Sequence, residues 1–358
     1  MTLSLATAGE SHGPALVAIV SGLPAGLVLD RAAIDADLRR RQQGYGRSPR
    51  QQIETDEVEV LAGLRHGRTL GTPLALVVRN RDHRNWEWGM SPWPPEGDPA
   101  GKGTKPVTLP RPGHADLAGA QKFGLGDVRD ALERASARHT AVVVAAGAVA
   151  KALLHEIDVD VEGAARREHG ADPEAVDAAR ADRDTLGGIV EVTARGVPPG
   201  LGSYASRETR LDARLAAAVM GIQAVKGVEI GDGFALAGLR GSEAHDEIAP
   251  DRHRATNRAG GIEAGVSNGE EIVVRAAMKP LPTLMRPLRS VDLDTGEPAE
   301  ALVERSDVSA VEALAVVAEA AVAFELARAA REKFGGDALG DFVAAWRAYL
   351  ERIAWTAR

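Results

Sequence analysis

Strand-like and helix-like segments follow one another along this chain without a regular strand–helix–strand rhythm, and this irregular order limits the folds open to it. Short apolar or β-branched runs between Gly and Pro punctuation predict strands at residues 15–20, 58–61, 74–78, 188–192, 228–230, 234–237 and 271–277. Apolar residues at helical spacing predict helices at 31–43, within 115–154, and at 211–220, 308–334 and 341–353. Mixed elements of this kind favour the α+β class with layered sheets.

Three further segments carry specific expectations. Asp30 is the predicted N-cap of the first helix, and arginines close that helix. Residues 141–154 are the most apolar stretch, and about 14 residues are too few to cross a bilayer core of about 30 Å, so a buried helix is expected. Residues 81–112, rich in Trp and Pro, predict a long irregular loop, and loops of that length are often functional or disordered. Residues 164–183 predict an exposed connection.

Composition excludes several kinds of chemistry. With 43 Lys and Arg against 51 Asp and Glu, the net charge is -8, so neither a nucleic-acid partner nor a membrane partner is predicted. The absence of cysteine excludes disulfides and thiolate-ligated metals, and no metal site is predicted. The first residues lack the basic and apolar regions of an export signal, which favours a cytoplasmic protein. No Gly-x-Gly-x-x-Gly follows a strand and no Walker A loop occurs, so neither a Rossmann site nor a P-loop is expected.

One basic segment interrupts this acidic chain. Residues 39–50 hold five arginines and no acid, together with glycines that let the backbone approach a ligand. A guanidinium binds phosphate or carboxylate with a planar fork, so a small polyanionic substrate is one interpretation. A solvated helix end or a nucleic-acid patch is the alternative, and composition leaves both open.

Two histidines lie in loops where a side chain can point into a cleft. His12 stands between glycines just before the first long strand, and His114 is followed two residues later by Asp116, which can orient its ring. Such histidines can pass a proton to a departing phosphate oxygen near neutral pH, although many loop histidines are surface residues. Asp307, at a helix start, can act either as a cap or as a base.

Two more groups of residues are candidates for binding. Arg134 and Arg138 are four residues apart, so on one helix they would share a face and hold an anion between them; an ordinary charged stripe gives the same pattern. Lys279 and Thr283 frame a proline-stiffened loop directly after a strand, a usual place for ligand contacts.

Taken together, seven segments resemble the chorismate synthase family, and the resemblance spans nearly the whole chain. In family order they are Gly9-Glu10-Ser11-His12-Gly13, Gly44-Tyr45-Gly46-Arg47, Arg111-Pro112-Gly113-His114-Ala115-Asp116, Glu133-Arg134-Ala135-Ser136-Ala137-Arg138, Gln223-Ala224-Val225-Lys226-Gly227, Gly231-Asp232-Gly233-Phe234 and Arg305-Ser306-Asp307.

The resemblance implies a trans-1,4 elimination of phosphate from 5-enolpyruvylshikimate-3-phosphate. The product is chorismate, and the cofactor is reduced FMN, used without net redox change. It also implies a β-α-β sandwich, one domain over residues 1–358, and a homotetramer. NADPH enters only as an indirect reductant of the flavin.

The resemblance also implies roles for individual residues. His12 would protonate the leaving phosphate, His114 would stabilise the reduced flavin, and Asp307 would remove the ring proton. Substrate contacts would be Ser11, Arg41, Arg47, Arg50 and Arg138. Arg41 and Arg47 are also described in the family as a nicotinamide-nucleotide site. Flavin contacts would be Arg134, Ala135, Ser136, Gln223, Ala224, Ala264, Lys279, Pro280, Leu281, Pro282, Thr283 and Arg305.

Three positions depart from the family pattern. Ala264 replaces a frequent glycine, Leu109 replaces a frequent arginine, and His139 stands where an acid is common. For His139 the favoured interpretation is a surface histidine on a helix.

Two rival functions remain: a flavin oxidoreductase that passes hydride from NADPH to FMN, and an anion- or RNA-binding module that uses residues 39–50.

Overall fold

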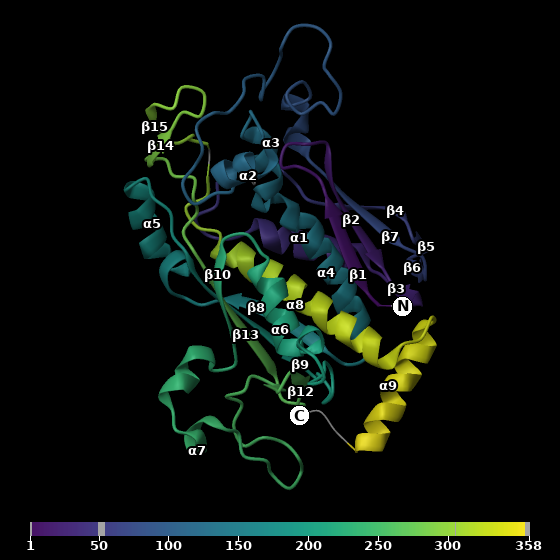
Figure 1. The fold of residues 1–358 in the computed structure, drawn as a ribbon. Helices are drawn as coiled ribbons and strands as arrows, with labels where there is room; N and C mark the ends of the chain where they lie inside the picture. The colour runs from purple at the N-terminus through teal and green to yellow at the C-terminus, as the bar shows by residue number, and fades with distance from the viewer. Residues whose placement is uncertain (1, 49–53, 305, 355–358) are drawn as a thin grey trace.

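A computed structural model describes residues 2–48, 54–304 and 306–354, and its two large sheets are both antiparallel (Figure 1). The first sheet has the order β1-β2-β7-β4, from strands Ser4–Ala8, Ala15–Ser21, Leu74–Arg79 and Val58–Ala62. The second has the order β10-β13-β9-β8, from strands Val225–Ile230, Ile272–Met278, Gly188–Arg195 and Asp160–Ala165. Alternating burial along β2 and β9 marks one face of each sheet as the inner one.

Long apolar helices cover these inner faces. Helix α4 (Thr140–His155) packs on β2 and β7, whereas α8 (Val311–Phe334) packs on β8 and β9. The two helices run side by side, as Figure 1 shows, and a side chain at Gly147 of α4 would collide with Ala320 of α8. Helices α1 (Arg31–Gln42) and α6 (Leu211–Met220) complete this layer, and one buried apolar cluster joins it to both sheets.

Smaller elements surround this core. Strands β3 (Ala25–Val28), β6 (Arg68–Leu70) and β5 (Leu64–Arg65) form a three-stranded sheet, and two hairpins pair β11 (Ile262–Glu263) with β12 (Val266–Ser267) and β14 (Arg289–Val291) with β15 (Pro298–Glu300). The remaining α-helices of the described residues are α2 (Asp116–Phe123), α3 (Arg129–Ala135), α5 (Pro173–Ala181), α7 (Gly241–Ala244) and α9 (Leu339–Ile353).

Most predicted elements are confirmed, including Asp30, whose side chain accepts from the Ala32 N–H at the start of α1. Residues 81–112 are irregular apart from one 3₁₀ turn, Arg81–Asn85. The stretch 129–155 is, among the described residues, the one helical segment long and apolar enough to cross a membrane. However, 72% of its most apolar window is buried in the protein, as in a core helix.

Two predictions are wrong. Residues 234–237 are part of a 3₁₀ helix (Gly233–Gly238), because positive φ angles at Gly231 and Gly233 turn the chain away from the sheet and leave Phe234 83% exposed. The region 164–183 is more than a connection. It holds α5, which Asp172 caps and whose Val176 is fully buried.

Candidate active site

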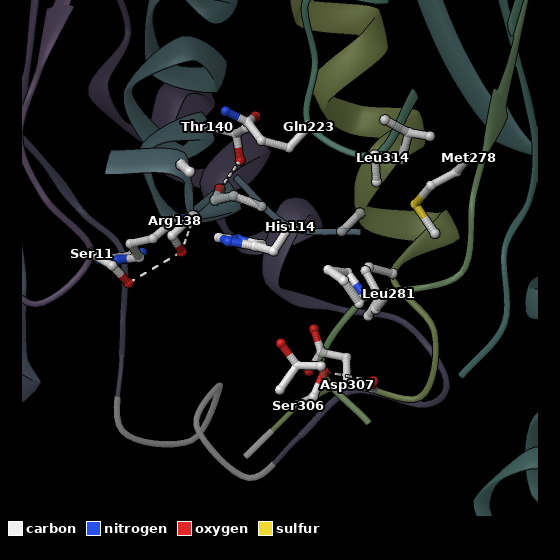
Figure 2. A pocket seen from close by; sticks show the side chains of 18 of the residues that line it. Ser11, His114, Arg138, Thr140, Gln223, Met278, Leu281, Ser306, Asp307 and Leu314 are labelled. Atoms are coloured by element: carbon white, nitrogen blue, oxygen red, sulfur yellow. Dashed lines mark hydrogen bonds between the residues drawn. The ribbon is translucent and has the colours of Figure 1, made fainter. Parts of the chain in front are cut away.

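A cleft of about 490 Å³ opens where segments distant in sequence meet beside the ends of α1, α3, α4 and α8. A volume of this size suits a small-molecule ligand. Figure 2 shows His114 near its centre, with Ser11 and Arg138 on one side and Ser306 and Asp307 on another. Fifteen residues that the sequence proposed for the site line it: Ser11, His12, Arg41, Arg47, His114, Ala135, Ser136, Arg138, Gln223, Ala224, Lys279, Leu281, Pro282, Thr283 and Asp307.

Five proposed residues are not seen there. Arg50 and Arg305 lie outside the described residues, and the lining does not include Arg134, Pro280 or Ala264. Arg134 is exposed and donates to the backbone and side-chain oxygens of Thr7. Ala264 has a φ of +49° in the turn between β11 and β12, a backbone conformation that explains why glycine is frequent at this position.

The prediction that Arg134 and Arg138 share a helix face is therefore wrong. Helix α3 ends at Ala135 because Ser136 is extended, and its hydroxyl accepts from the Arg138 N–H. This break sends Arg138 into the protein, where it is 8% exposed, and leaves Arg134 at the surface.

His12 is held by a carboxylate from a distant part of the chain. Its Nδ1 lies 2.8 Å and 3.0 Å from the two oxygens of Glu133, and its backbone N–H donates to the same carboxylate at 2.8 Å. Glu133 is almost fully buried, which alone would raise its pKa, but hydrogen bonds from His12 outweigh burial and lower it. The His12 ring also stacks on Trp86 at 4.1 Å between centroids.

His114 has a similar partner close in sequence. Its Nδ1 hydrogen-bonds Asp116, as the sequence predicted, and Arg111 donates to the same carboxylate at 2.8 Å. Burial would raise the pKa of Asp116, but these two partners hold it well below its usual range. Arg111 also donates to Thr283 at 3.0 Å, which ties the histidine loop to the loop after β13.

Two buried arginines share one carboxylate behind the cleft. Arg41 lies 3.4 Å and Arg138 2.7 Å from Asp56, which is itself completely buried. Arg41 also donates to the Thr140 hydroxyl at 2.9 Å. Burial lowers the pKa of the Arg41 guanidinium to about 9, and the charge of Asp56 only partly opposes this. Arg138 also lies 3.6 Å from Glu54, so Arg41 is the guanidinium of this pair whose charge is less fully balanced.

The Asp307 carboxylate binds residues 47 and 48 and does not cap a helix. Its two oxygens lie 3.1 Å from Arg47 Nη1 and 2.6 Å from the Ser48 backbone nitrogen, whereas α8 begins after Ala310 without a side-chain cap. This arrangement excludes the cap interpretation. Arg47, held by Asp307, and the buried Arg41 both point inward, which speaks against a solvated basic patch.

His139 is not the surface residue that was favoured from sequence. Its ring is half-buried behind the cleft, with Nδ1 3.0 Å from the Ser136 carbonyl and 3.1 Å from the Gln223 amide nitrogen. Burial lowers the pKa of His139, and the charges of Arg134 and Arg41 add to the effect. His139 therefore holds the side chain of Gln223, which lines the cleft.

Three polar atoms in the lining have no hydrogen-bond partner among the described residues. They are Arg47 Nε, Arg138 Nη2 and Gln223 Oε1, and all three are buried. Arg138 Nη2 lies 3.6 Å from Glu54, beyond hydrogen-bond distance. Buried donors without partners are costly, so these atoms mark places where a ligand would be stabilised.

Sequence reasoning missed several residues of the site. Glu54, Asp56, Trp86, Arg111 and Glu133 all contact a candidate residue, and none had been given a role. For Glu133 and Arg111 the only signal was their place inside the motifs. Among the described lining residues, five cations face three carboxylates, so the cleft favours an anion.

Comparisons with known proteins agree with one another. The family model described as chorismate synthase matches residues 3–330. A chorismate synthase of Rubrobacter xylanophilus is 54% identical and covers 100% of this chain and 99% of its own, and one of Symbiobacterium thermophilum is 53% identical, covering 97% and 98%. A crystal structure of chorismate synthase superposes with a TM-score of 0.77 at 36% identity, covering 99% of this chain and 98% of the other.

Proposed function

The chain belongs to the chorismate synthase family, whose members are lyases of the shikimate pathway, and we propose that its cleft eliminates phosphate from 5-enolpyruvylshikimate-3-phosphate with reduced FMN bound beside the ester. The product is chorismate. The reaction breaks one C–O bond and one ring C–H bond and forms a new ring double bond, so no net redox change occurs.

The observation that carries this proposal is the pair of unpartnered guanidinium nitrogens in the cleft. Arg47 Nε and Arg138 Nη2 are buried without a hydrogen-bond partner among the described residues, although Arg138 Nη2 lies 3.6 Å from Glu54 and each guanidinium is anchored by a carboxylate on another nitrogen. A substrate with one phosphate and two carboxylates supplies the missing acceptors through charge-assisted hydrogen bonds. Anchored donors of this kind need little reorganisation on binding.

The residues present also suit a flavin. Leu132, Ile222, Leu314 and Val317 give the cleft apolar surface, and Gln223 adds an unpartnered acceptor. Flat aromatic cofactors need such a mixed lining. When bound there, reduced FMN supplies electron density to the reacting ring. Ala135, Ser136, Ala224 and the loop from Lys279 to Thr283 are proposed to hold it.

His12 is the proposed general acid. Since Glu133 occupies Nδ1, the proton that leaves is the one on Nε2: the Nε2–H bond breaks as an O–H bond forms on the departing phosphate. His114, fixed by Asp116, is proposed to stabilise negative charge on the flavin. Asp307 is the proposed acceptor of the ring proton, and Arg47 keeps its carboxylate at the cleft.

The experiment is phosphate release from the ester under anaerobic conditions with reduced FMN. His12→Ala should lower turnover by roughly 10²–10⁴-fold, the range for loss of a general acid, with little loss of ester affinity. His155→Ala is the matched control, because His155 is exposed and its ring pairs, within the described part of the chain, only with Asp160 at 3.4 Å. Folded wild-type protein that binds FMN and yet releases no phosphate would overturn the proposal. Equal losses in the two variants would remove His12 from its role.

Further features of the family belong to the same proposal. The contacts of α4 with the first sheet and of α8 with the second support a β-α-β sandwich, and the large buried cluster that joins both sheets to the helices supports one domain over residues 1–358. A homotetramer, a cytoplasmic location and NADPH as an indirect reductant follow from the resemblance alone. Light scattering of the purified protein tests the first, and anaerobic reduction of FMN by NADPH with the protein alone tests the last.

A further inference from the structure

We propose that Glu133 and Trp86 are positioning residues for His12: the carboxylate fixes the imidazole tautomer, and the indole fixes the plane of the ring, so that Nε2 faces the cleft. The inference rests on the proposed function, because His12 is the acid of that reaction. Neither residue lines the cleft itself, so both would act through His12.

Glu133 decides which ring nitrogen reaches the substrate. Both of its oxygens lie within 3.0 Å of Nδ1, and one also accepts the His12 backbone N–H at 2.8 Å. The carboxylate is ionised because the hydrogen bonds of His12 lower its pKa despite burial, so it can only accept. Nδ1 must therefore carry a hydrogen, and Nε2 is the nitrogen left for proton transfer.

Trp86 closes one face of the same ring. The His12 and Trp86 rings stack with centroids 4.1 Å apart and planes at 25°. Trp86 is itself held in place: it is 7% exposed, and its indole N–H donates to Asp82 at 3.2 Å. Turning the imidazole so that its two nitrogens exchange places would require this stack to open.

Arg129 connects the two positioning residues. Its guanidinium lies 4.8 Å from the Trp86 ring centroid, and its Nη1 donates to Glu133 at 3.4 Å. A cation over an indole is attracted to the ring, so Arg129 fixes Trp86 while it orients Glu133. The long loop that supplies Trp86 is thus joined to α3, which supplies the other two residues.

This arrangement makes a specific kinetic prediction. In Glu133→Gln the amide can donate to Nδ1 and supplies no negative charge, which disfavours the doubly protonated ring that gives up its Nε2 proton. Turnover should therefore fall by roughly 10–10²-fold, as when a carboxylate that orients a histidine is replaced. The KM for the ester should change by less than about 3-fold, since Glu133 does not touch the cleft. Trp86→Leu should lower turnover by about 10-fold, and Trp86→Phe should retain most of it because an aromatic face remains.

A double-mutant cycle distinguishes positioning from general damage. If Glu133 acts only through His12, adding Glu133→Gln to His12→Ala should lower single-turnover phosphate release by less than about 3-fold further. Additive losses, or unchanged turnover in Glu133→Gln alone, would overturn the inference.

Glu87→Gln is the control, because Glu87 is an exposed neighbour of Trp86, and the urea midpoint of each variant reports folding. Wild-type protein without activity would count against the proposed function; an active wild type with an equally active Glu133→Gln would count against this inference alone.

Discussion

Arg40 and Arg41 are consecutive residues of α1, and their electrostatic surroundings are opposite. Arg40 forms two hydrogen bonds with Glu319, at 2.8 Å and 2.9 Å, and one with Asp37, and these contacts raise its pKa above the ordinary value for arginine. Arg41 shares Asp56 with Arg138, and burial lowers its pKa to about 9. Two neighbouring residues of one helix therefore differ: nearby carboxylates balance the charge of Arg40, and they balance the charge of Arg41 less fully.

The difference reflects two uses of buried charge. Arg40, Asp37, Lys151 and Glu319 form a closed cluster of two cations and two anions that joins α1, α4 and α8, and Glu319 also accepts the Gly163 N–H of β8. Among the described residues, every charged group of this cluster pairs with an opposite charge of the same cluster. At the cleft, Arg47 Nε and Arg138 Nη2 have no hydrogen-bond partner among the described residues, and an anion would complete their environment. The closed cluster is expected to contribute to stability, and the open one to binding.

The largest expected effect concerns the closed cluster. Glu319→Gln leaves Arg40 and Lys151 short of one negative charge, and breaking a buried pair in this way typically costs 3–5 kcal/mol. Because Arg40 is partly exposed, we expect about 3 kcal/mol, the lower end of that range, measured as a loss in free energy of unfolding in urea. Glu332→Gln on the same helix is the control, since its pair with Arg214 is more exposed and should contribute less than about 1 kcal/mol. Equal losses would contradict the distinction.

The second prediction compares the replacement of each of the two arginines by glutamine. Arg41→Gln should weaken binding of the ester by about 30-fold, close to 2 kcal/mol, because it removes one of the positive charges that line the cleft. Its free energy of unfolding should change by less than about 1 kcal/mol, since the cost of burying an unbalanced charge disappears as well. Arg40→Gln should show the reverse: lower stability and an ester Kd within about 3-fold of wild type. Calorimetric titration and urea unfolding of both variants measure the two effects. If Arg40→Gln weakened binding as much as Arg41→Gln, the comparison would fail.

The two histidine pairs show how far sequence reasoning could reach into the site. Asp116 follows His114 by two residues in one loop, so its role could be predicted from spacing alone. Glu133 lies 121 residues from His12, and only the fold brings them together. Motifs therefore identified which residues belong to the cleft. Their partners in the interior depend on how α3 and the first loop are packed.

The same limit applies to the secondary structure. The sequence predicted α1, α4 and α8 well, because α1 has apolar residues four apart on one face, whereas α4 and α8 are long apolar segments that are buried on most sides. It failed at residues 234–237, where an apolar run without a neighbouring strand became a 3₁₀ helix. It also failed to predict that Arg138 turns inward, which follows from the single extended residue Ser136 between α3 and the next helical turn.

The smallest expected effect uses His139 to report the unbalanced charge. Burial is the main reason that its pKa lies below the ordinary 6.5, and the positive charge of Arg41 is a lesser one. The folded protein disfavours the protonated ring. His139 therefore has no effect on the free energy of unfolding above about pH 6.5, and it lowers that free energy as the pH falls from 6.5 through its folded pKa. Arg41→Gln should therefore raise the His139 pKa by less than about one unit, toward 6.5, and narrow the pH range over which His139 lowers stability. Arg40→Gln should leave the His139 pKa unchanged. Titration of the His139 ring protons by NMR measures the shift, with His139→Gln identifying the signal. An equal shift in both variants would mean that the charge of Arg41 is not the one His139 senses.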